Sequence, residues 1–166
     1  VLGVSERGAK HAAEIGAGFT YGHFINAENG VTALKTYRKH FRPSPDRKKP
    51  ESFVCIFVIC AETEEKAEEL ALSQDKWLLN VGKGADTKIP SVEEVRKKAF
   101  RQNELKKVEE NRARAVIGTP EQVKTKIEQL AELYETDEFM IITNIYRFED
   151  KVRSYELLAE VFELTS

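Results

Sequence analysis

A short turn near the start of the sequence has the composition of a phosphate-binding turn. Residues 2–8 (Leu-Gly-Val-Ser-Glu-Arg-Gly) combine small residues with one hydroxyl and one cation, directly before a predicted helix. Small residues let an anion approach the backbone, and the first N–H groups of a helix have no acceptor inside that helix. Ser5 and Arg7 would supply the side-chain contacts. The alternative is that Ser5 only caps the helix and that Arg7 is solvated.

Other polar residues stand at the ends of later predicted strands. His23 lies near the C-terminal end of the second strand, where it could act as a donor or proton carrier in a cleft. A partly buried, hydrogen-bonded histidine is the alternative. The remaining candidates end the last and the third strands: Thr143, Asn144 and Tyr146, and Glu62 and Thr63. In a parallel sheet these ends share one rim, although capping and aromatic packing explain the same residues equally well.

Two classes of site find little support in the sequence. His11 and His40 lie on predicted helices with no second histidine or carboxylate at a ligand spacing, so we expect no metal site. Cys60 has no adjacent histidine and lies in an apolar strand, which favours an inert core thiol over a nucleophile. Cys55 lies in the same strand, too far from Cys60 for a disulfide, which favours a cytoplasmic protein.

The charge balance argues against nucleic-acid and membrane binding. The 166 residues include 26 Lys and Arg against 28 Asp and Glu, a formal net charge of −2. No apolar run approaches the roughly 20 residues that a membrane-spanning helix needs. One basic cluster contains Lys35, Arg38, Lys39, Arg42, Arg47, Lys48 and Lys49. We interpret it, and the mixed charges of residues 97–114, as solvated surface.

The elements that would position these residues alternate between strand and helix. Predicted strands cover residues 1–4, 18–25, 52–61 and 138–145, and predicted helices 5–16, 31–41, 63–82, 91–114, 119–134 and 149–162. Ser5, Thr63, Ser91 and Thr119 have the chemistry of helix caps. The uninterrupted apolar run 52–61 indicates a central strand covered on both faces. This pattern favours an α/β protein with a parallel sheet, as a single domain over residues 1–166 with a helical insertion at about 82–115.

Five segments, taken in order, resemble the luciferase-like flavin-dependent monooxygenases. They are LGVSERGAKHAAEIG, YGHFIN, VICAETEEKAEELA, ENRARAVIGTPEQVKTKIEQLAELY and DEFMIITNIYRFEDKVRSYELLAE. These matches cover essentially the whole chain, and five in order are far more specific than a single motif. The resemblance implies the C-terminal half of a TIM (β/α)8 barrel, with parallel strands and an inserted helical segment.

The resemblance also implies a cofactor and a reaction. This family binds FMN, reduced by a partner flavin reductase or by a nicotinamide, and uses O2 to oxidise a small organic substrate; a deazaflavin is also possible. The family's turn after the fifth strand holds the flavin phosphate, and it matches Gly3, Val4, Ser5, Arg7 and Gly8 here. Many relatives have a hydroxyl residue where this chain has Val4, so a backbone N–H would replace that contact. His23 would lie at the end of the sixth strand, near the barrel mouth.

A complete barrel of this type needs about 250 residues, so four preceding strand–helix units are expected to be missing from this sequence. The family's residues for the flavin ring and substrate lie largely in those units. The catalytic residues therefore stay unknown, and we expect this chain alone to be inactive. A half barrel has open strand edges, which predicts a homo-oligomer or pairing with the missing N-terminal half. The rival hypothesis is a non-catalytic flavin-binding or structural relative.

Overall fold

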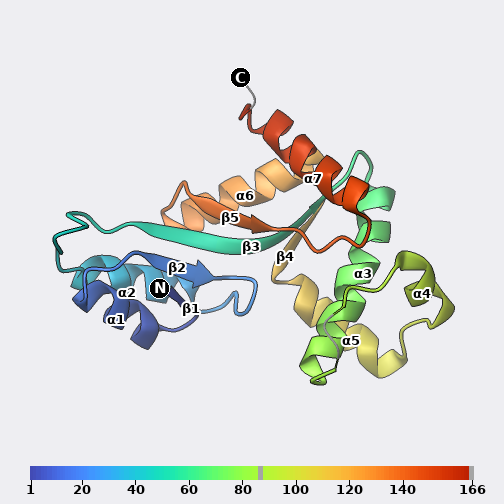
Figure 1. Ribbon diagram of the computed structural model, residues 1–166, viewed down its shortest axis with the longest axis horizontal. Helices are drawn as coiled ribbons and strands as arrows, with labels where there is room; N and C mark the ends of the chain where they lie inside the picture. Colours follow the sequence, from blue (N-terminus) through green and yellow to red (C-terminus); the bar gives the residue numbers. More distant parts are fainter. Residues whose placement is uncertain (86–87, 165–166) are drawn as a thin grey trace. The chain divides into compact units, whose positions relative to one another are not determined.

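Strands and helices alternate in the computed structural model, which describes residues 1–85 and 88–164 (Figure 1). The elements are β1 (Leu2–Gly3), α1 (Glu6–Glu14), β2 (Phe19–Gly22), α2 (Gly30–His40), β3 (Ser52–Cys60), α3 (Glu64–Gly82), α4 (Val92–Lys97), α5 (Gln102–Arg112), β4 (Ala115–Gly118), α6 (Pro120–Tyr134), β5 (Phe139–Ile142) and α7 (Phe148–Val161). The pairs β1–β2, β2–β3 and β3–β4 are parallel, and β5 also pairs with β3. The predicted parallel α/β sheet is confirmed.

The chain divides into two compact units, which are described separately. The first contains Val1–Ile56 and Glu128–Ile141, and the second contains Phe57–Ile127 and the residues from Ile142 onward. β3 contributes its first residues to one unit and its last residues to the other.

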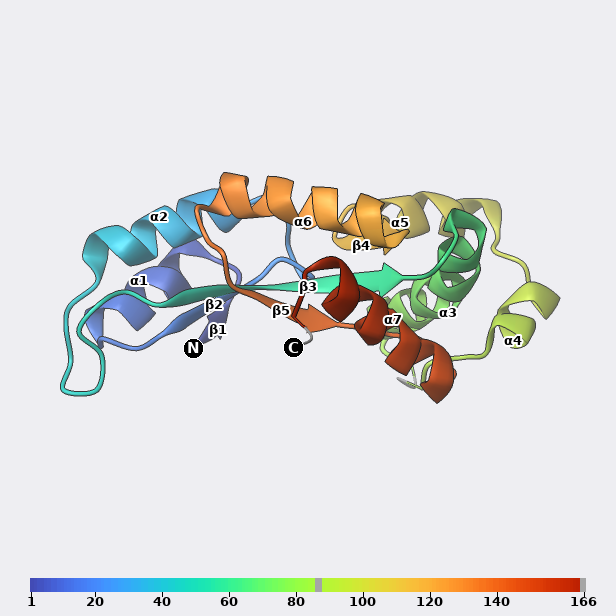
Figure 2. The ribbon, with the colours of Figure 1, turned by 90° about the horizontal axis from the view of Figure 1, so that it is seen from above.

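In the first unit, two helices pack beside β1 and β2. Ala9, Ala12 and Ala13 of α1 are fully buried, and their spacing places them on one face of the helix. Figures 1 and 2 show α1 and α2 side by side, and both helices contact β2. Phe19 of β2 is fully buried as well. Their burial shows that this face of α1 is covered within the first unit, where α1 contacts α2, β1 and β2.

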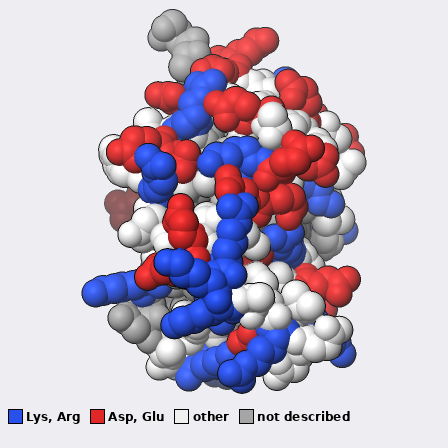
Figure 3. Space-filling model, turned by 90° about the vertical axis from the view of Figure 1, so that its right-hand side faces the viewer, with Lys and Arg blue, Asp and Glu red and all other residues white. Residues whose placement is uncertain are grey.

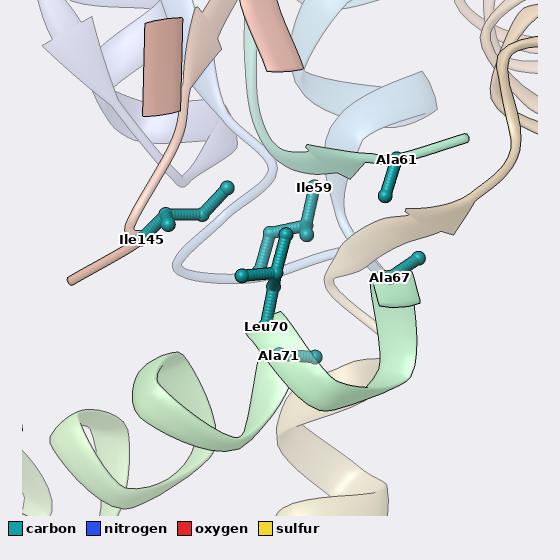
Figure 4. Close-up of a cluster of buried hydrophobic side chains, with 6 residues drawn as sticks. All are labelled: Ile59, Ala61, Ala67, Leu70, Ala71 and Ile145. Atoms are coloured by element: carbon teal, nitrogen blue, oxygen red, sulfur yellow. The ribbon is translucent and has the colours of Figure 1, made fainter. Parts of the chain in front are cut away.

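In the second unit, the end of β3 and the start of α3 form an apolar core. Its members are Ile59, Ala61, Ala67, Leu70, Ala71 and Ile145, drawn in Figure 4. α3 begins at its predicted cap, because the Thr63 side chain accepts a hydrogen bond from the Lys66 N–H at 3.2 Å. This packing holds the end of β3 and Ile145, which precedes α7, against α3.

The single helix predicted for residues 91–114 is wrong. The structure has two helices, α4 and α5, separated at Lys98, whose backbone (φ −119°, ψ 44°) is not helical. Ser91 caps α4 as predicted, through a capping box with Glu94. α5 starts independently because the Glu104 carboxylate accepts a hydrogen bond from the Arg101 N–H at 3.1 Å.

All four predicted strands are shorter in the structure, most of all those predicted for residues 18–25 and 138–145, and one strand was missed. β2 ends at Gly22, because the N–H groups of Ile25 and Asn26 both donate to the Gly22 carbonyl and turn the chain. β5 ends at Ile142 rather than at Ile145. β4 was not predicted as a strand, since its four residues are too few to show an alternating pattern.

Candidate functional site

The turn between β1 and α1 has the geometry of a capped helix start. Ser5 is in an extended conformation (φ −136°, ψ 155°), and its Oγ accepts a hydrogen bond from the Gly8 N–H at 3.2 Å. The Ser5 carbonyl accepts the first helical bond, from Ala9, at 3.0 Å. The Ser5 hydroxyl therefore caps α1, as one of the two alternatives predicted, and it remains exposed to solvent.

Several hydrogen-bond donors at this turn remain available. Within residues 1–85 and 88–164, the N–H groups of Glu6 and Arg7 have no acceptor, and the Arg7 guanidinium has no ion-pair partner. The neighbouring Glu6 carboxylate is held by α2, where Thr36 Oγ1 donates to it at 3.0 Å. The cap and first turn of this nine-residue helix thus contain two unpaired backbone donors, one hydroxyl and one cationic residue. An anion of phosphate size is the ligand that this donor set suits.

The small residues of the turn, which would let an anion approach the backbone, also take part in packing. A Cβ on Gly3 would lie 3.0 Å from the Phe19 ring, so a larger residue there would press against the buried aromatic of β2. Val4 packs towards β2, since its Cγ1 would lie 3.1 Å from a Cβ on Gly22. Val4 can therefore contribute only backbone to a ligand. A Cβ on Gly8 would meet the Ser5 hydroxyl at an ordinary 3.5 Å, so steric fit does not demand glycine there.

His23 lies in the first unit and is 6% exposed. Its Nδ1 lies 2.7 Å from the hydroxyl of Tyr134, the last residue of α6, and the two rings meet edge to face at 5.8 Å. The Tyr134 hydroxyl also donates to the Ala27 carbonyl at 3.3 Å. A hydroxyl has one hydrogen, so while it donates to Ala27 the histidine must donate from Nδ1. Tyr134 thereby fixes the orientation of the imidazole ring.

Tyr134 was not among the predicted site residues. It is fully buried, and burial, with a smaller effect of Tyr21, raises its pKa to about 12. The side chain is therefore a neutral hydrogen-bonding group at ordinary pH. In the sequence it stands 111 residues from His23, as an ordinary aromatic at a helix end, so no local signal connects the two.

Most of the other rim candidates serve structural roles in the second unit. Glu62 accepts from Arg153 at 2.8 Å, Thr63 caps α3, and Thr143 Oγ1 donates to the Val58 carbonyl at 2.9 Å. Tyr146 is exposed. The buried Nδ2 of Asn144 has no acceptor in the part of the chain that the structure describes. Asn144 and Tyr146 are the candidates whose polar or aromatic groups the second unit leaves available.

The two cysteines are buried thiols. Burial, followed by the nearby Glu121 and Glu62, raises the pKa of Cys60 to about 11, and burial also raises the pKa of Cys55. Thiolate nucleophiles require the opposite shift. Among the described residues, no three His, Cys, Asp or Glu side chains group as metal ligands, and no helix has the length and apolarity to cross a bilayer.

Residues 1–137 match the family model described as luciferase-like monooxygenase. The chain belongs to this family. The uncharacterized protein YceB of Bacillus subtilis (strain 168) is 51% identical over 162 residues, which are 98% of this chain and 49% of YceB. The chain therefore spans about half the length of the curated relative that it matches.

Solved structures of luciferase-like proteins have the same fold over the whole chain. The crystal structure of apo-MsnO8 superimposes with a TM-score of 0.83 at 28% identity, and the match covers 99% of this chain and 50% of that one. The oxygenating constituent of 3,6-diketocamphane monooxygenase from Pseudomonas putida, in complex with FMN, superimposes with a TM-score of 0.51 at 17% identity. That match covers 98% of this chain and 46% of the other chain, and the likeness concerns the fold alone. The parallel α/β arrangement is consistent with half of a luciferase-like barrel, as predicted.

Proposed function

We propose that this chain supplies the flavin-phosphate side of an FMN-dependent luciferase-like monooxygenase. The observation that carries the proposal is the start of α1, where the N–H groups of Glu6 and Arg7 have no acceptor in the described chain, the exposed Ser5 hydroxyl caps the helix, and Arg7 contributes a cation in the first turn. Membership of the family and the FMN complex of a protein with the same fold support a flavin as the ligand. The reaction of the whole protein would be oxidation of a small organic substrate by O2.

The residues of the turn would hold the phosphate without moving. The partial positive charge of the α1 N-terminus and the Arg7 cation both favour a dianionic group. Ser5 would donate its hydroxyl hydrogen to a phosphate oxygen while its oxygen continues to accept from Gly8, since a hydroxyl can do both. Bound reduced FMN would supply the electrons for O2 chemistry.

His23 would have a secondary part in this site. Tyr134 occupies its Nδ1, so that nitrogen would not contact a cofactor. The ring cannot turn freely, because rotation would break the bond to a buried hydroxyl. His23 is therefore suited to a fixed contact.

The proposed partners follow from the same reaction. A flavin reductase would deliver the reduced cofactor, and a second copy of the chain or the N-terminal half of a barrel would complete the remaining walls of the site. A deazaflavin with a phosphorylated side chain presents similar chemistry to the turn and is the alternative cofactor to test.

The decisive experiment compares FMN with riboflavin, which lacks the phosphate. We expect FMN to bind this chain at least about tenfold more tightly in a fluorescence titration, because only FMN engages the turn. Ser5→Gly retains most of the capping function, since glycine is nearly as good a cap as serine, but removes the hydroxyl. It should weaken FMN binding by about five- to tenfold and leave riboflavin unchanged.

The outcome that would overturn the proposal is equal affinity for FMN and riboflavin in the wild-type chain. Arg7→Gln provides a second test that leaves the cap intact, and it should also weaken FMN selectively. If neither substitution changes the FMN affinity, the phosphate is not bound at this turn.

A further inference from the structure

A pocket in the second unit lies between the first half of α3, the start of α4 and the residues that lead into α7. Its volume is about 400 Å³, with the solvent at its mouth included, which is enough for a small organic molecule. α3 lines it with Lys66, Glu69, Leu70 and Ser73, and their spacing of three and four residues places them on one face of the helix. We call it the α3–α7 pocket.

The buried part of the lining is apolar apart from one hydroxyl. Leu70 of α3 and Ile145, which precedes α7, both line the pocket and belong to the apolar core of this unit (Figure 4). Ser73 is 1% exposed, and its Oγ has no hydrogen-bond partner in the part of the chain that the structure describes. A buried hydroxyl without a partner costs free energy, so a ligand that offers it a hydrogen bond gains affinity.

The exposed part of the lining carries charges of both signs, and each of its cations already has a carboxylate nearby. Lys66 Nζ lies 3.1 Å from Glu69, which also binds Arg96 at 2.9 Å. Arg147 Nε lies 3.9 Å from Glu149. Figure 3 shows the side of the second unit that carries α4, where Asp and Glu are interspersed with Lys and Arg. An anionic ligand would therefore have to compete with carboxylates that these cations already attract.

Two carboxylates of the lining have no ion-pair partner. Glu93 stands in the first turn of α4 and Asp150 in the first turn of α7, and neither makes an ion pair within residues 1–85 and 88–164. The exposed aromatic ring of Tyr146, which also lines the pocket, is a group that attracts cations. A metal ion is disfavoured, because no three His, Cys, Asp or Glu side chains of the described residues group as ligands. These features favour an organic cation.

We propose that the α3–α7 pocket binds a small organic ammonium ion that carries a hydrogen-bonding group, such as a hydroxyl, at its other end. Glu93 and Asp150 attract the ammonium group, Leu70 and Ile145 contact the alkyl chain, and the Ser73 hydroxyl pairs with the far polar group. The pocket shares no residue with the β1–α1 turn, so this proposal and the flavin proposal can fail separately.

Ligand-observed NMR titrations at pH 7 with three probes of equal chain length test each contact. Aminobutanol with its two groups at opposite ends has both the ammonium group and the hydroxyl, butylamine has the ammonium group alone, and the terminal butanediol has no charge. Aminobutanol should bind about fivefold or more tightly than either of the others, because each of them lacks one contact. Ser73→Ala should remove its advantage over butylamine and change the affinity of butylamine by less than about twofold.

A matched pair of variants separates the pocket from general charge attraction. E93Q/D150N neutralises the two carboxylates of the lining, so it should weaken aminobutanol and butylamine about fivefold and leave butanediol unchanged. E65Q/E109Q changes the net charge equally at exposed carboxylates outside the pocket, so it should change all three affinities by less than about twofold. Circular dichroism checks that every variant is folded. Equal losses in the two double variants, butanediol bound as tightly as aminobutanol, or no binding of aminobutanol would overturn the proposal.

Discussion

Two glycines of this chain differ in whether the surrounding structure has room for a side chain. A Cβ on Gly30, the first residue of α2, would lie 2.7 Å from the Tyr21 ring and would also collide with the ring of Tyr134. A Cβ on Gly82, the last residue of α3, would meet nothing within 4 Å. Gly30 is therefore required by the aromatic pair that supports His23, whereas Gly82 is not required by packing.

We predict opposite effects for alanine at these two positions. Gly30→Ala should destabilise the chain by about 1–3 kcal/mol, because two buried rings must shift, although alanine is the better helix former. Gly82→Ala should stabilise it by about 0.5–1 kcal/mol through helix propensity alone. Urea unfolding followed by circular dichroism measures both. A Gly30→Ala variant as stable as Gly82→Ala would contradict the packing of Tyr21 and Tyr134 described here.

Residues whose role depends on near neighbours in the sequence could be predicted, whereas those whose role depends on distant contacts could not. Ser5, Thr63 and Ser91 were identified as caps because a cap depends only on neighbours within about four residues. The contact of His23 with Tyr134 depends on how α6 returns to the end of β2, which no local pattern encodes. The role of Ser5 as a phosphate ligand was one of two alternatives that the local pattern offered; the family resemblance favoured it, and it stays a prediction.

At the level of elements, α3 and α5 are joined by a buried ion pair. Asp75 of α3 is 1% exposed on its side chain, and Arg112 of α5 donates to it from Nε at 3.0 Å and from its terminal nitrogen at 2.8 Å. Arg112 also binds the exposed Glu68. Burial raises the pKa of Asp75, and the bonds from Arg112 oppose that rise. The charge on Asp75 is therefore tolerated only while Arg112 is present.

Arg112→Met should cost about 3 kcal/mol of unfolding free energy at pH 7, because it leaves a buried carboxylate unpaired. A carboxyl whose pKa is raised in the folded state loses stability as the pH rises through that pKa. The deficit should therefore shrink as the pH falls and Asp75 takes up a proton. Denaturation at pH 7 and pH 5 tests this. Asp75→Leu combined with Arg112→Met removes both charges and should restore most of the stability; no recovery would show that packing, not charge, was lost.

The elements that were mispredicted share a physical cause. The start of α5 after the break depends on the Glu104 carboxylate accepting a hydrogen bond from the Arg101 N–H. Arginine is not a typical N-cap residue, so the sequence carried no cap signal for a second helix there. β4 forms because its residues find the exposed edge of β3, a tertiary effect that a run of four residues cannot reveal. The long helices and β3 were predictable because each carries its own repeated apolar pattern.

At the level of the whole molecule, apolar surface remains uncovered around α7. Phe148 of α7 is 73% exposed, and Val152 follows it by one turn on the same face. β1 pairs only with β2, and β5 only with β3, within the described chain. Exposed apolar faces and open strand edges favour association with another chain.

We therefore predict that the isolated chain self-associates at micromolar concentration. Phe148→Ser with Val152→Ser should shift the sedimentation velocity distribution towards monomer, since it removes the apolar face of α7. Leu133→Ser is the matched control, because Leu133 is 53% exposed on a different helix, and it should have little effect. A purely monomeric wild-type chain at these concentrations would refute the prediction.

The buried apolar run of β3 is also prone to aggregate when the chain is unfolded. Residues 54–60 (VCIFVIC) contain no charge, proline or glycine, the composition of segments that stack into amyloid-like sheets. Charged residues and a proline stand on either side: Lys48, Lys49, Pro50 and Glu51 before the run, and Glu62 after it. Such flanking residues act as gatekeepers that slow aggregation without preventing it. How quickly β3 finds its neighbours in a new chain will therefore limit the yield of folded protein as much as its equilibrium stability does.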